Sequence, residues 1–194
     1  MKVKMVALSL AALGLYLAAP AQELSEEEQA YLAALEEQLP GTLMNNPIEI
    51  SLQTFGDHYS AKVVKADIDG EAAYQVRVKS AQPRPWDVSV TGPLTAGVSE
   101  GDTVTVAFWA RAPKPDGATG KGHIQLRVQQ KAAPYSGVVE EMVEIGEDWQ
   151  LHEVSGVSGY AFTADEIAIA FNIGDHRQTL QFGPFYVLNL GPQS

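Results

Sequence analysis

Two stretches of strict apolar–polar alternation constrain the fold of this chain more than any other feature of its sequence. They cover residues 103–112 and 122–130, and their apolar positions are Val104, Val106, Phe108, Ala110, Ile124, Leu126 and Val128. Successive side chains of a β-strand point to opposite faces of a sheet, so a period of two indicates strands with one buried face. We therefore expect both stretches to be half-buried strands.

The rest of the chain from Thr42 onward also reads as short strands. Clusters of Gly, Pro, Asp and Ser, such as Gln82-Pro83-Arg84-Pro85, separate the apolar runs. The expected strands are 48–53, 61–66, 73–79, 86–91, 103–112, 122–130, 138–145, 150–154, 166–173 and 179–190, the last interrupted at Gly183-Pro184. About ten short strands without intervening helices predict a two-sheet antiparallel sandwich over residues 42–192.

The first 21 residues predict an export signal. Lys2 and Lys4 precede an apolar run that ends in Ala19-Pro20-Ala21, a pattern typical of a cleavage site. The run is shorter than the ~20 apolar residues of a membrane span, so we expect no span. The chain has no cysteine, hence no disulfide and no lipid-attachment cysteine. The expected location is the periplasm or the medium.

Residues 22–41 predict an acidic amphipathic helix and a linker. Ser25-Glu26-Glu27-Glu28 has the pattern of a capping box, and the helix should run to about Gln38 before Leu39-Pro40-Gly41 ends it. The helix could dock on the sandwich, contact a partner or act as a spacer.

Charge argues against one class of partner. The formal net charge is −11, which disfavours nucleic acid. Residues 72–131 reverse the sign, with eight basic against four acidic side chains. An anionic glycan that docks on these middle strands therefore stays open.

The polar side of the two alternating stretches presents Trp109, Arg111, Gln125, Arg127 and Gln129. An aromatic ring offers flat apolar contact to a sugar ring, and amide and guanidinium groups offer hydrogen-bonding partners for hydroxyls. The pattern therefore indicates a glycan-binding surface. The alternatives are that the polar groups only solvate the outside of a sandwich, and that Trp109 packs beneath a loop or the N-terminal helix.

Pairing of the two stretches would complete this surface. A hairpin with Arg111 opposite His123 would place Trp109 opposite Gln125 and join their side chains in one continuous ribbon. The sequence alone leaves this register open.

Three residues on other expected strands extend the candidate site: Arg77, Asp87 and Asn172. Arg77 would extend the basic edge, and Asn172 points outward next to the small residue Ala170. Asp87 lies opposite Trp86, whose parity predicts a core position.

The sequence contains no catalytic constellation. The four histidines, at 58, 123, 152 and 176, have no metal-ligand spacing, so we expect no metal ligand among them. No Gly-x-Ser-x-Gly elbow or phosphate loop is present. Two carboxylates that converge in space would be compatible with a small polysaccharide hydrolase or lyase, the least favoured alternative.

An ordered set of segments resembles the carbohydrate-binding modules of families four, nine and twenty-two. The segments are 73–78 (AYQVRV), 85–88 (PWDV), 101–112 (GDTVTVAFWARA), 133–135 (APY), 148–150 (DWQ), 171–174 (FNIG) and 178–180 (QTL). The resemblance covers roughly residues 43–191. It implies a galactose-binding-like jelly roll, so the expected fold is all-β: a two-sheet antiparallel jelly-roll β-sandwich preceded by one short α-helix.

The resemblance also implies a function. Such modules accompany secreted glycoside hydrolases, bind polysaccharide on a concave sheet and have no catalytic activity. We therefore expect xylan, β-glucan or a uronate-bearing glycan as ligand, and a secreted glycoside hydrolase as a candidate partner. These modules often hold structural Ca²⁺ with carboxylates near the first and last strands, but Gly183-Pro184-Phe185-Tyr186 has none, so we expect no cofactor. The alternative is a structural or adaptor sandwich whose polar sheet binds protein.

The export signal gives the first testable prediction. Protein recovered from the periplasm or the medium should lack its first 21 residues in an intact-mass measurement. Recovery of a chain that retains Met1 in a membrane fraction would contradict it.

Overall fold

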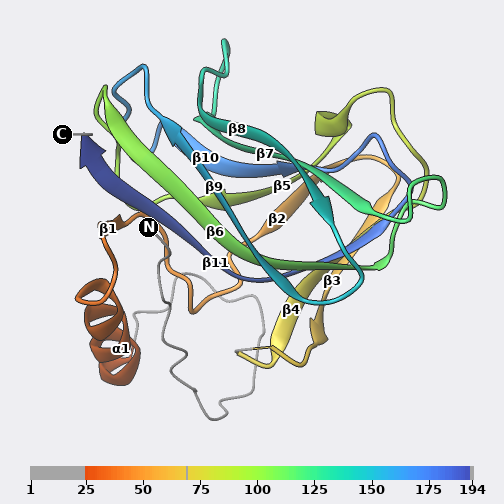
Figure 1. The fold of residues 1–194 in the computed structure, drawn as a ribbon, viewed down its shortest axis with the longest axis horizontal. Coiled ribbons are helices and arrows are strands. Elements are labelled where there is room, and N and C mark those ends of the chain that lie inside the picture. Colours follow the sequence, from red (N-terminus) through yellow and green to blue (C-terminus); the bar gives the residue numbers. More distant parts are fainter. Residues whose placement is uncertain (1–24, 69, 193–194) are drawn as a thin grey trace.

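Two antiparallel sheets contain all the strands that the computed structural model describes, over residues 25–68 and 70–192 (Figure 1). Sheet A is six-stranded, with the order β3-β4-β11-β6-β9 and with β1 also paired to β11. Sheet B is five-stranded, with the order β2-β5-β10-β7-β8. The strands of sheet A are β1 (Thr42–Leu43), β3 (Tyr59–Lys65), β4 (Ala72–Val78), β6 (Asp102–Lys114), β9 (Gln150–Val157) and β11 (Thr179–Pro192). Those of sheet B are β2 (Gln53–Gly56), β5 (Val88–Pro93), β7 (Gly122–Gln130), β8 (Gly137–Ile145) and β10 (Ile167–Asn172).

The sandwich and its N-terminal helix confirm the expected fold class. Helix α1 (Glu26–Glu36) begins with the predicted capping box: Glu28 N–H donates to Ser25 Oγ at 3.3 Å, and Ser25 N–H donates to the Glu28 carboxylate at 2.8 Å. Figure 1 shows α1 beside β1, at the border of sheet A and away from sheet B. No helix among residues 25–68 and 70–192 is long and apolar enough to cross a membrane. The predicted export signal lies outside these residues.

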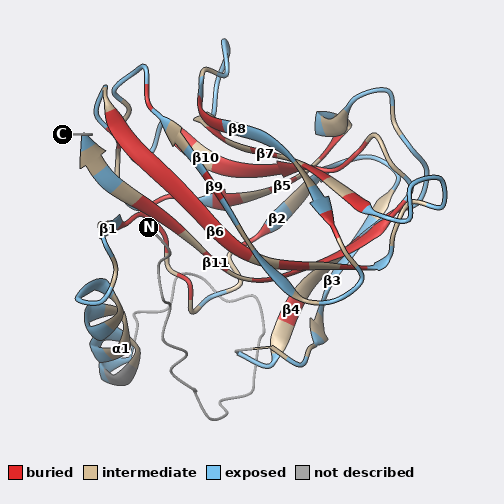
Figure 2. Cartoon of the chain, viewed as in Figure 1, coloured by how far each residue is buried: buried red, intermediate tan, exposed pale blue. Residues whose placement is uncertain are grey.

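Apolar side chains from both sheets meet between them, and Phe171 lies at the centre. Figure 2 shows the buried residues along β6, β11 and β10. Phe171 is fully buried, and its ring lies 5.2 Å from that of Phe108 and 5.0 Å from that of Phe182, both in sheet A. Phe185, on the same sheet, meets it edge-on at 6.2 Å. The alternating strands therefore bury one face each against the opposite sheet.

The expected hairpin between residues 103–112 and 122–130 is wrong. β6 belongs to sheet A and β7 to sheet B, so Arg111 does not face His123. Trp109 pairs with Leu151 of β9, and Gln125 pairs with Met142 of β8 and with Asn172 of β10. The physical reason is that alternation states which side of a strand is buried, and two strands that cover one core from opposite sides alternate alike.

Two further local expectations differ from the structure. Of the strand expected at 48–53, only Gln53 belongs to a strand, because residues 48 and 49 form bends and β2 begins at Gln53. Trp86 lies in a 3₁₀ turn, η1 (Pro85–Asp87), and is 52% exposed instead of buried. Pro85 at the start of that turn fixes its backbone angle and removes an N–H donor, which delays β5 to Val88.

Replacement of Phe171 tests the central role of its ring. Phe171→Ala should lower the free energy of unfolding by about 3–5 kcal/mol in urea denaturation, because it would leave a cavity beneath the rings of Phe108, Phe182 and Phe185 of sheet A. Phe55→Ala is the matched control: this ring is 55% exposed, so its removal should leave stability within about 0.5 kcal/mol. Equal losses in the two variants would contradict the assignment.

Candidate functional site

The predicted site residues lie on two different faces of the sandwich. Strand pairing places Gln125, Arg127, Gln129 and Asn172 on the outer face of sheet B, whereas Trp109, Arg111 and Arg77 lie on the outer face of sheet A. Asp87 lies in η1, before β5. The single ribbon expected from the hairpin therefore does not exist.

The outer face of sheet B, here called the sheet B face, carries rows of side chains that cross neighbouring strands. Pairing fixes two of these rows, which are Phe55–Ser89–Asn172–Gln125–Met142 and Gln53–Thr91–Ala170–Arg127–Glu140. With neighbouring strands ~4.8 Å apart, a row over five strands spans about 19 Å. This length suits an extended chain of several sugar rings.

Polar groups form a hydrogen-bonded chain across the sheet B face. Asn172 Nδ2 donates to Gln125 Oε1 at 3.2 Å, and Gln125 Nε2 donates to Glu140 Oε1 at 3.0 Å. Arg127 forms an ion pair with the second oxygen of Glu140 at 3.3 Å. Asn172 is only 3% exposed, so its amide orients Gln125 and is not itself open to solvent. Glu140 is the most accessible member of this hydrogen-bonded row, with 53% of its side chain exposed, whereas Gln125 and Arg127 are half-buried.

Two polar atoms on this face lack hydrogen-bond partners. Arg127 Nε and Gln129 Oε1 are buried beneath neighbouring atoms and form no hydrogen bond with the described residues. An unpaired buried polar atom is costly, so rearrangement around a polar ligand or water would improve the hydrogen bonding of both groups.

Exposed apolar side chains border the polar rows. Phe55, Tyr135 and Met142 are 55%, 50% and 57% exposed, and they come from β2, the β7–β8 loop and β8. Between them lies the small residue Ala170. Arg127 donates to the backbone carbonyl of Tyr135 at 3.2 Å, which holds the tyrosine loop against the face. On such a surface, the aromatic rings at the margins can stack on sugar rings, and the polar rows can form hydrogen bonds with sugar hydroxyls.

On the outer face of sheet A, three polar side chains form a hydrogen-bonded network. Arg111 Nε donates to Gln181 Oε1 at 2.7 Å, and Gln181 Nε2 donates to Gln75 Oε1 at 2.8 Å. The Arg111 guanidinium also lies 4.9 Å from the centre of the Trp149 ring. Gln181, at the centre of this network, is 6% exposed, whereas Arg111 and Gln75 are half-buried.

Trp109 is half-buried on this second face. It borders Gly183, where an added Cβ would lie 3.1 Å from Trp109 Cβ and 2.7 Å from Ile68 Cδ1. Ile68 comes from the β3–β4 loop, so this loop reaches the strand next to Trp109. A role for Trp109 in ligand binding stays a prediction.

Arg77 and Asp87 have separate surroundings. Arg77 lines a surface pocket at one end of sheet A together with Lys114 and Arg177, a cationic set able to hold an anion. The Asp87 carboxylate accepts from the backbone N–H of Arg84 at 3.1 Å and pairs with its guanidinium at 2.8 Å. These bonds hold the η1 turn, and a ligand role for either residue stays a prediction.

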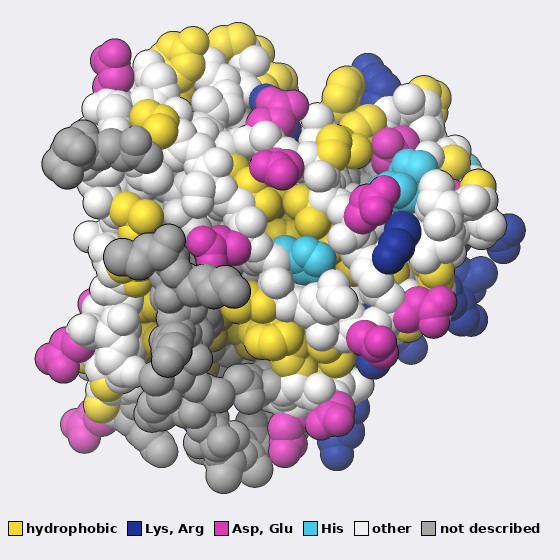
Figure 3. All heavy atoms as spheres, viewed as in Figure 1, with side chains coloured by type: hydrophobic (Ala, Val, Ile, Leu, Met, Phe, Trp, Pro, Cys, Tyr) yellow, Lys and Arg dark blue, Asp and Glu magenta, His cyan; other side chains and the backbone are white. Residues whose placement is uncertain are grey.

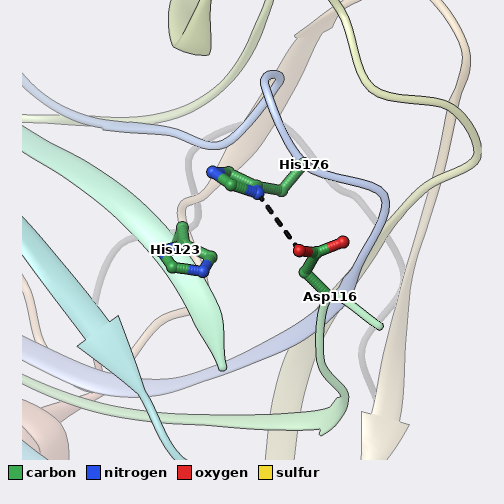
Figure 4. Close-up of side chains that lie close together, drawn as sticks. All are labelled: Asp116, His123 and His176. Atoms are coloured by element: carbon green, nitrogen blue, oxygen red, sulfur yellow. Dashed lines mark ion pairs between the residues drawn. The ribbon is translucent and has the colours of Figure 1, made fainter. Parts of the chain in front are cut away.

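Sequence reasoning missed a cluster of Asp116, His123 and His176. The two imidazole rings lie one above the other with centroids 4.0 Å apart, and Asp116 lies beside them (Figure 4). The residues come from two loops and the start of β7, so their spacing in the sequence does not predict the cluster. The only available signal was Gly174-Asp175-His176, which reads as an ordinary turn.

Comparison with known proteins identifies the fold. No protein-family model matches the chain, and no curated protein sequence matches it. Among solved structures, a CBM4 module is similar at 18% identity over 72% of this chain and 94% of that chain, with a TM-score of 0.57. The second N-terminal cellulose-binding domain of Cellulomonas fimi β-1,4-glucanase C is similar at 19% identity over 80% and 94%, with a TM-score of 0.56.

A third similar structure is the CBM22-1 xylan-binding domain of Paenibacillus barcinonensis Xyn10C. It shares 8% identity over 79% of this chain and 97% of that chain, with a TM-score of 0.54. At these identities the likeness concerns the fold. The chain therefore has the β-sandwich fold of carbohydrate-binding modules, as the resemblance in the sequence implied.

Burial affects the protonation of two histidines. Hydrophobic side chains gather in the middle of the face shown in Figure 3. His152 lies on β9, at the edge of sheet A, and is half-buried. Its ring stacks on Phe108 at 5.3 Å, and burial lowers its pKa. The pKa of His123 is also lowered, by burial first and then by the neighbouring His176.

These shifts predict a loss of stability in mild acid. Because both pKa values are lower in the folded chain, the unfolded chain takes up protons first as the pH falls below the ordinary histidine value of about 6.5. The free energy of unfolding should therefore fall from pH 7.5 to 5.5. His152→Leu should reduce this fall in urea denaturation, whereas the exposed His58→Gln should not. An unchanged pH dependence in His152→Leu would contradict the assignment.

Proposed function

We propose that this chain is a non-catalytic polysaccharide-binding protein that holds its glycan on the sheet B face. The observation that carries the proposal is the polar chain of Asn172, Gln125 and Glu140, which crosses three adjacent strands between exposed aromatic rings. Rings contribute by removing apolar C–H surface of the sugar from water. Amide and carboxylate groups exchange water for sugar hydroxyls, so they orient the chain more than they add free energy.

The solved structures support this class of ligand. The similar domain of Cellulomonas fimi is a cellulose-binding domain, and that of Paenibacillus barcinonensis is a xylan-binding domain. They share the sandwich with this chain, and the sheet B face supplies the local chemistry. We therefore propose an extended polysaccharide as the ligand.

Charge on the sheet B face favours a neutral glycan such as xylan or β-glucan. The cationic Arg127 forms an ion pair with Glu140. In the same sheet, Glu144 of β8 lies opposite His123 of β7 in the strand register. Two of the cations in residues 72–131 that suggested a uronate-bearing chain, Arg77 and Lys114, lie instead at the end of sheet A, where Arg177 joins them. A uronate-bearing glycan is therefore the second ligand class to test.

Export and partnership complete the proposal. The predicted signal would deliver the chain to the periplasm or the medium, where polysaccharides are accessible. A secreted glycoside hydrolase that acts on the same polysaccharide is the proposed partner. The binding protein itself should release no reducing ends from xylan or β-glucan.

Removal of the Tyr135 ring tests the site. Tyr135→Ala should weaken binding of xylan or β-glucan oligosaccharides by ~1–3 kcal/mol in titration calorimetry, if its ring is a hot spot of the face. The loop should keep its position, because Arg127 bonds to the backbone carbonyl at position 135 and not to the ring. The thermal stability of the variant should match that of the wild type.

Two control variants locate the site. Tyr160→Ala removes a ring that is 54% exposed in the β9–β10 loop, away from the sheet B rows, and should bind as the wild type does. Trp109→Ala tests the outer face of sheet A. Loss of binding in Trp109→Ala with none in Tyr135→Ala would move the site to sheet A and refute the proposal. Binding that weakens strongly with added salt would indicate a uronate ligand instead of a neutral one.

A further inference from the structure

Asp116, His123 and His176 bring three metal-ligating groups together at one end of the sandwich. His176 Nδ1 lies 3.6 Å from Asp116 Oδ2, and the candidate ligand atoms of the three residues all lie within 4.8 Å of one another. Figure 4 shows Asp116 beside the two stacked rings. The residues belong to the β6–β7 loop, β7 and the β10–β11 loop, so the fold creates this cluster.

A buried glutamine fixes the two histidines relative to each other. Gln178 is 3% exposed; its Oε1 accepts from His123 N–H at 2.7 Å, and its Nε2 donates to the His123 carbonyl at 2.9 Å. Nε2 also lies 3.1 Å from the carbonyl oxygen of Ile173. The loop that carries His176 is thereby held to the first residues of β7.

Asp116 is held by its own turn. Its N–H donates to the Lys121 carbonyl at 2.9 Å, and its carbonyl accepts from Gly120 N–H at 2.8 Å. This turn also contains Thr119, whose Oγ1 lies 2.7 Å from His123 Nε2. These bonds hold the main chain at Asp116 and His123, whereas the side chains can still rotate to bring their ligand atoms together.

The chemistry of the set suits a borderline-soft divalent ion. Two imidazole nitrogens and one carboxylate oxygen match Zn²⁺, which binds such ligands at about 2.0–2.2 Å. Ca²⁺ prefers six to eight oxygen ligands and fits this set poorly. Tetrahedral ligands lie roughly 3.4 Å apart at these bond lengths, so rotation of partly exposed side chains would close the present spacing.

Acidic groups next to the three candidate ligands favour the same ion. Asp175 Oδ2 lies 3.7 Å from His176 Nε2, and a carboxylate next to a ligating imidazole orients the ring and raises its basicity. Glu144 faces His123 across β8, so acidic groups surround the cluster.

We propose that Asp116, His123 and His176 bind a divalent transition-metal ion of the Zn²⁺ type, with water at the fourth position. The site lies beyond the rows proposed to hold glycan, and it does not depend on that function. A bound ion would tie the β6–β7 loop, the start of β7 and the β10–β11 loop to one another. The expected consequence is a more stable end of the sandwich.

Metal titration of the untagged full chain tests the site. After chelator treatment, Zn²⁺ should bind at one ion per chain in calorimetry, and Co²⁺ should give the visible absorption of a tetrahedral site. Saturating Zn²⁺ should raise Tm by roughly 5 °C. His123→Asn and His176→Asn should each weaken Zn²⁺ binding by about 100-fold or more, because each removes a direct ligand.

His58→Asn is the matched control. His58 follows Gly56-Asp57 as His176 follows Gly174-Asp175, and Asn tolerates its positive φ of 59°. This variant should bind Zn²⁺ as the wild type does. Equal Zn²⁺ affinity of the wild type and both cluster variants, or the absence of one-to-one binding to the wild type, would overturn the proposal.

A measurement on the wild type covers the case of a variant that does not fold. In NMR spectra, Zn²⁺ should shift the imidazole resonances of His123 and His176 and leave those of His58 and His152 in place. Shifts confined to His58 or His152 would refute the site. Glycan binding can fail without altering any of these readouts, so the two proposals are tested separately.

Discussion

Contact between the two sheets through the Phe171 ring is the constraint on which the rest of the structure depends. The ring lies on sheet B and packs against Phe108, Phe182 and Phe185 of sheet A, so both sheets share one core. Because the inner faces supply the apolar burial, the outer faces are free to carry polar groups. Both candidate binding faces exist for this reason, and each is supported by the core beneath it.

The two outer faces show how a structural polar network differs from a candidate binding surface. On sheet A, Arg111, Gln181 and Gln75 complete one another's hydrogen bonds, and Gln181 is almost fully buried. On sheet B, Arg127 Nε and Gln129 Oε1 lack partners, and exposed rings lie nearby. From residue types alone, the polar residues of both faces were predicted to form one sugar-binding surface. Trp149 Nε1, beside Arg111, also lacks a partner, so the two faces differ mainly in the exposed rings of Phe55 and Tyr135 at the margins of the sheet B face.

Much of the architecture could be predicted from local patterns, whereas the site could be predicted only in part. Period-two alternation located β6 and β7 because strand geometry imposes that period on any half-buried strand. Alternation contains no information about which sheet a strand joins, so Trp109 and Gln125 were wrongly placed side by side. His123 and His176 were missed because only folding brings residues 53 positions apart into contact.

The Tyr135 loop has a consequence for how such a surface diversifies. Its position is fixed by a bond from Arg127 to the main-chain carbonyl, while the ring projects outward and is half exposed. Different side chains at position 135 would therefore be presented from the same backbone, without a change in the core. If the proposed site is correct, single substitutions by residues that tolerate the positive φ of 58° at this position could alter ligand preference, because the main chain holds the loop and the side chain faces the ligand.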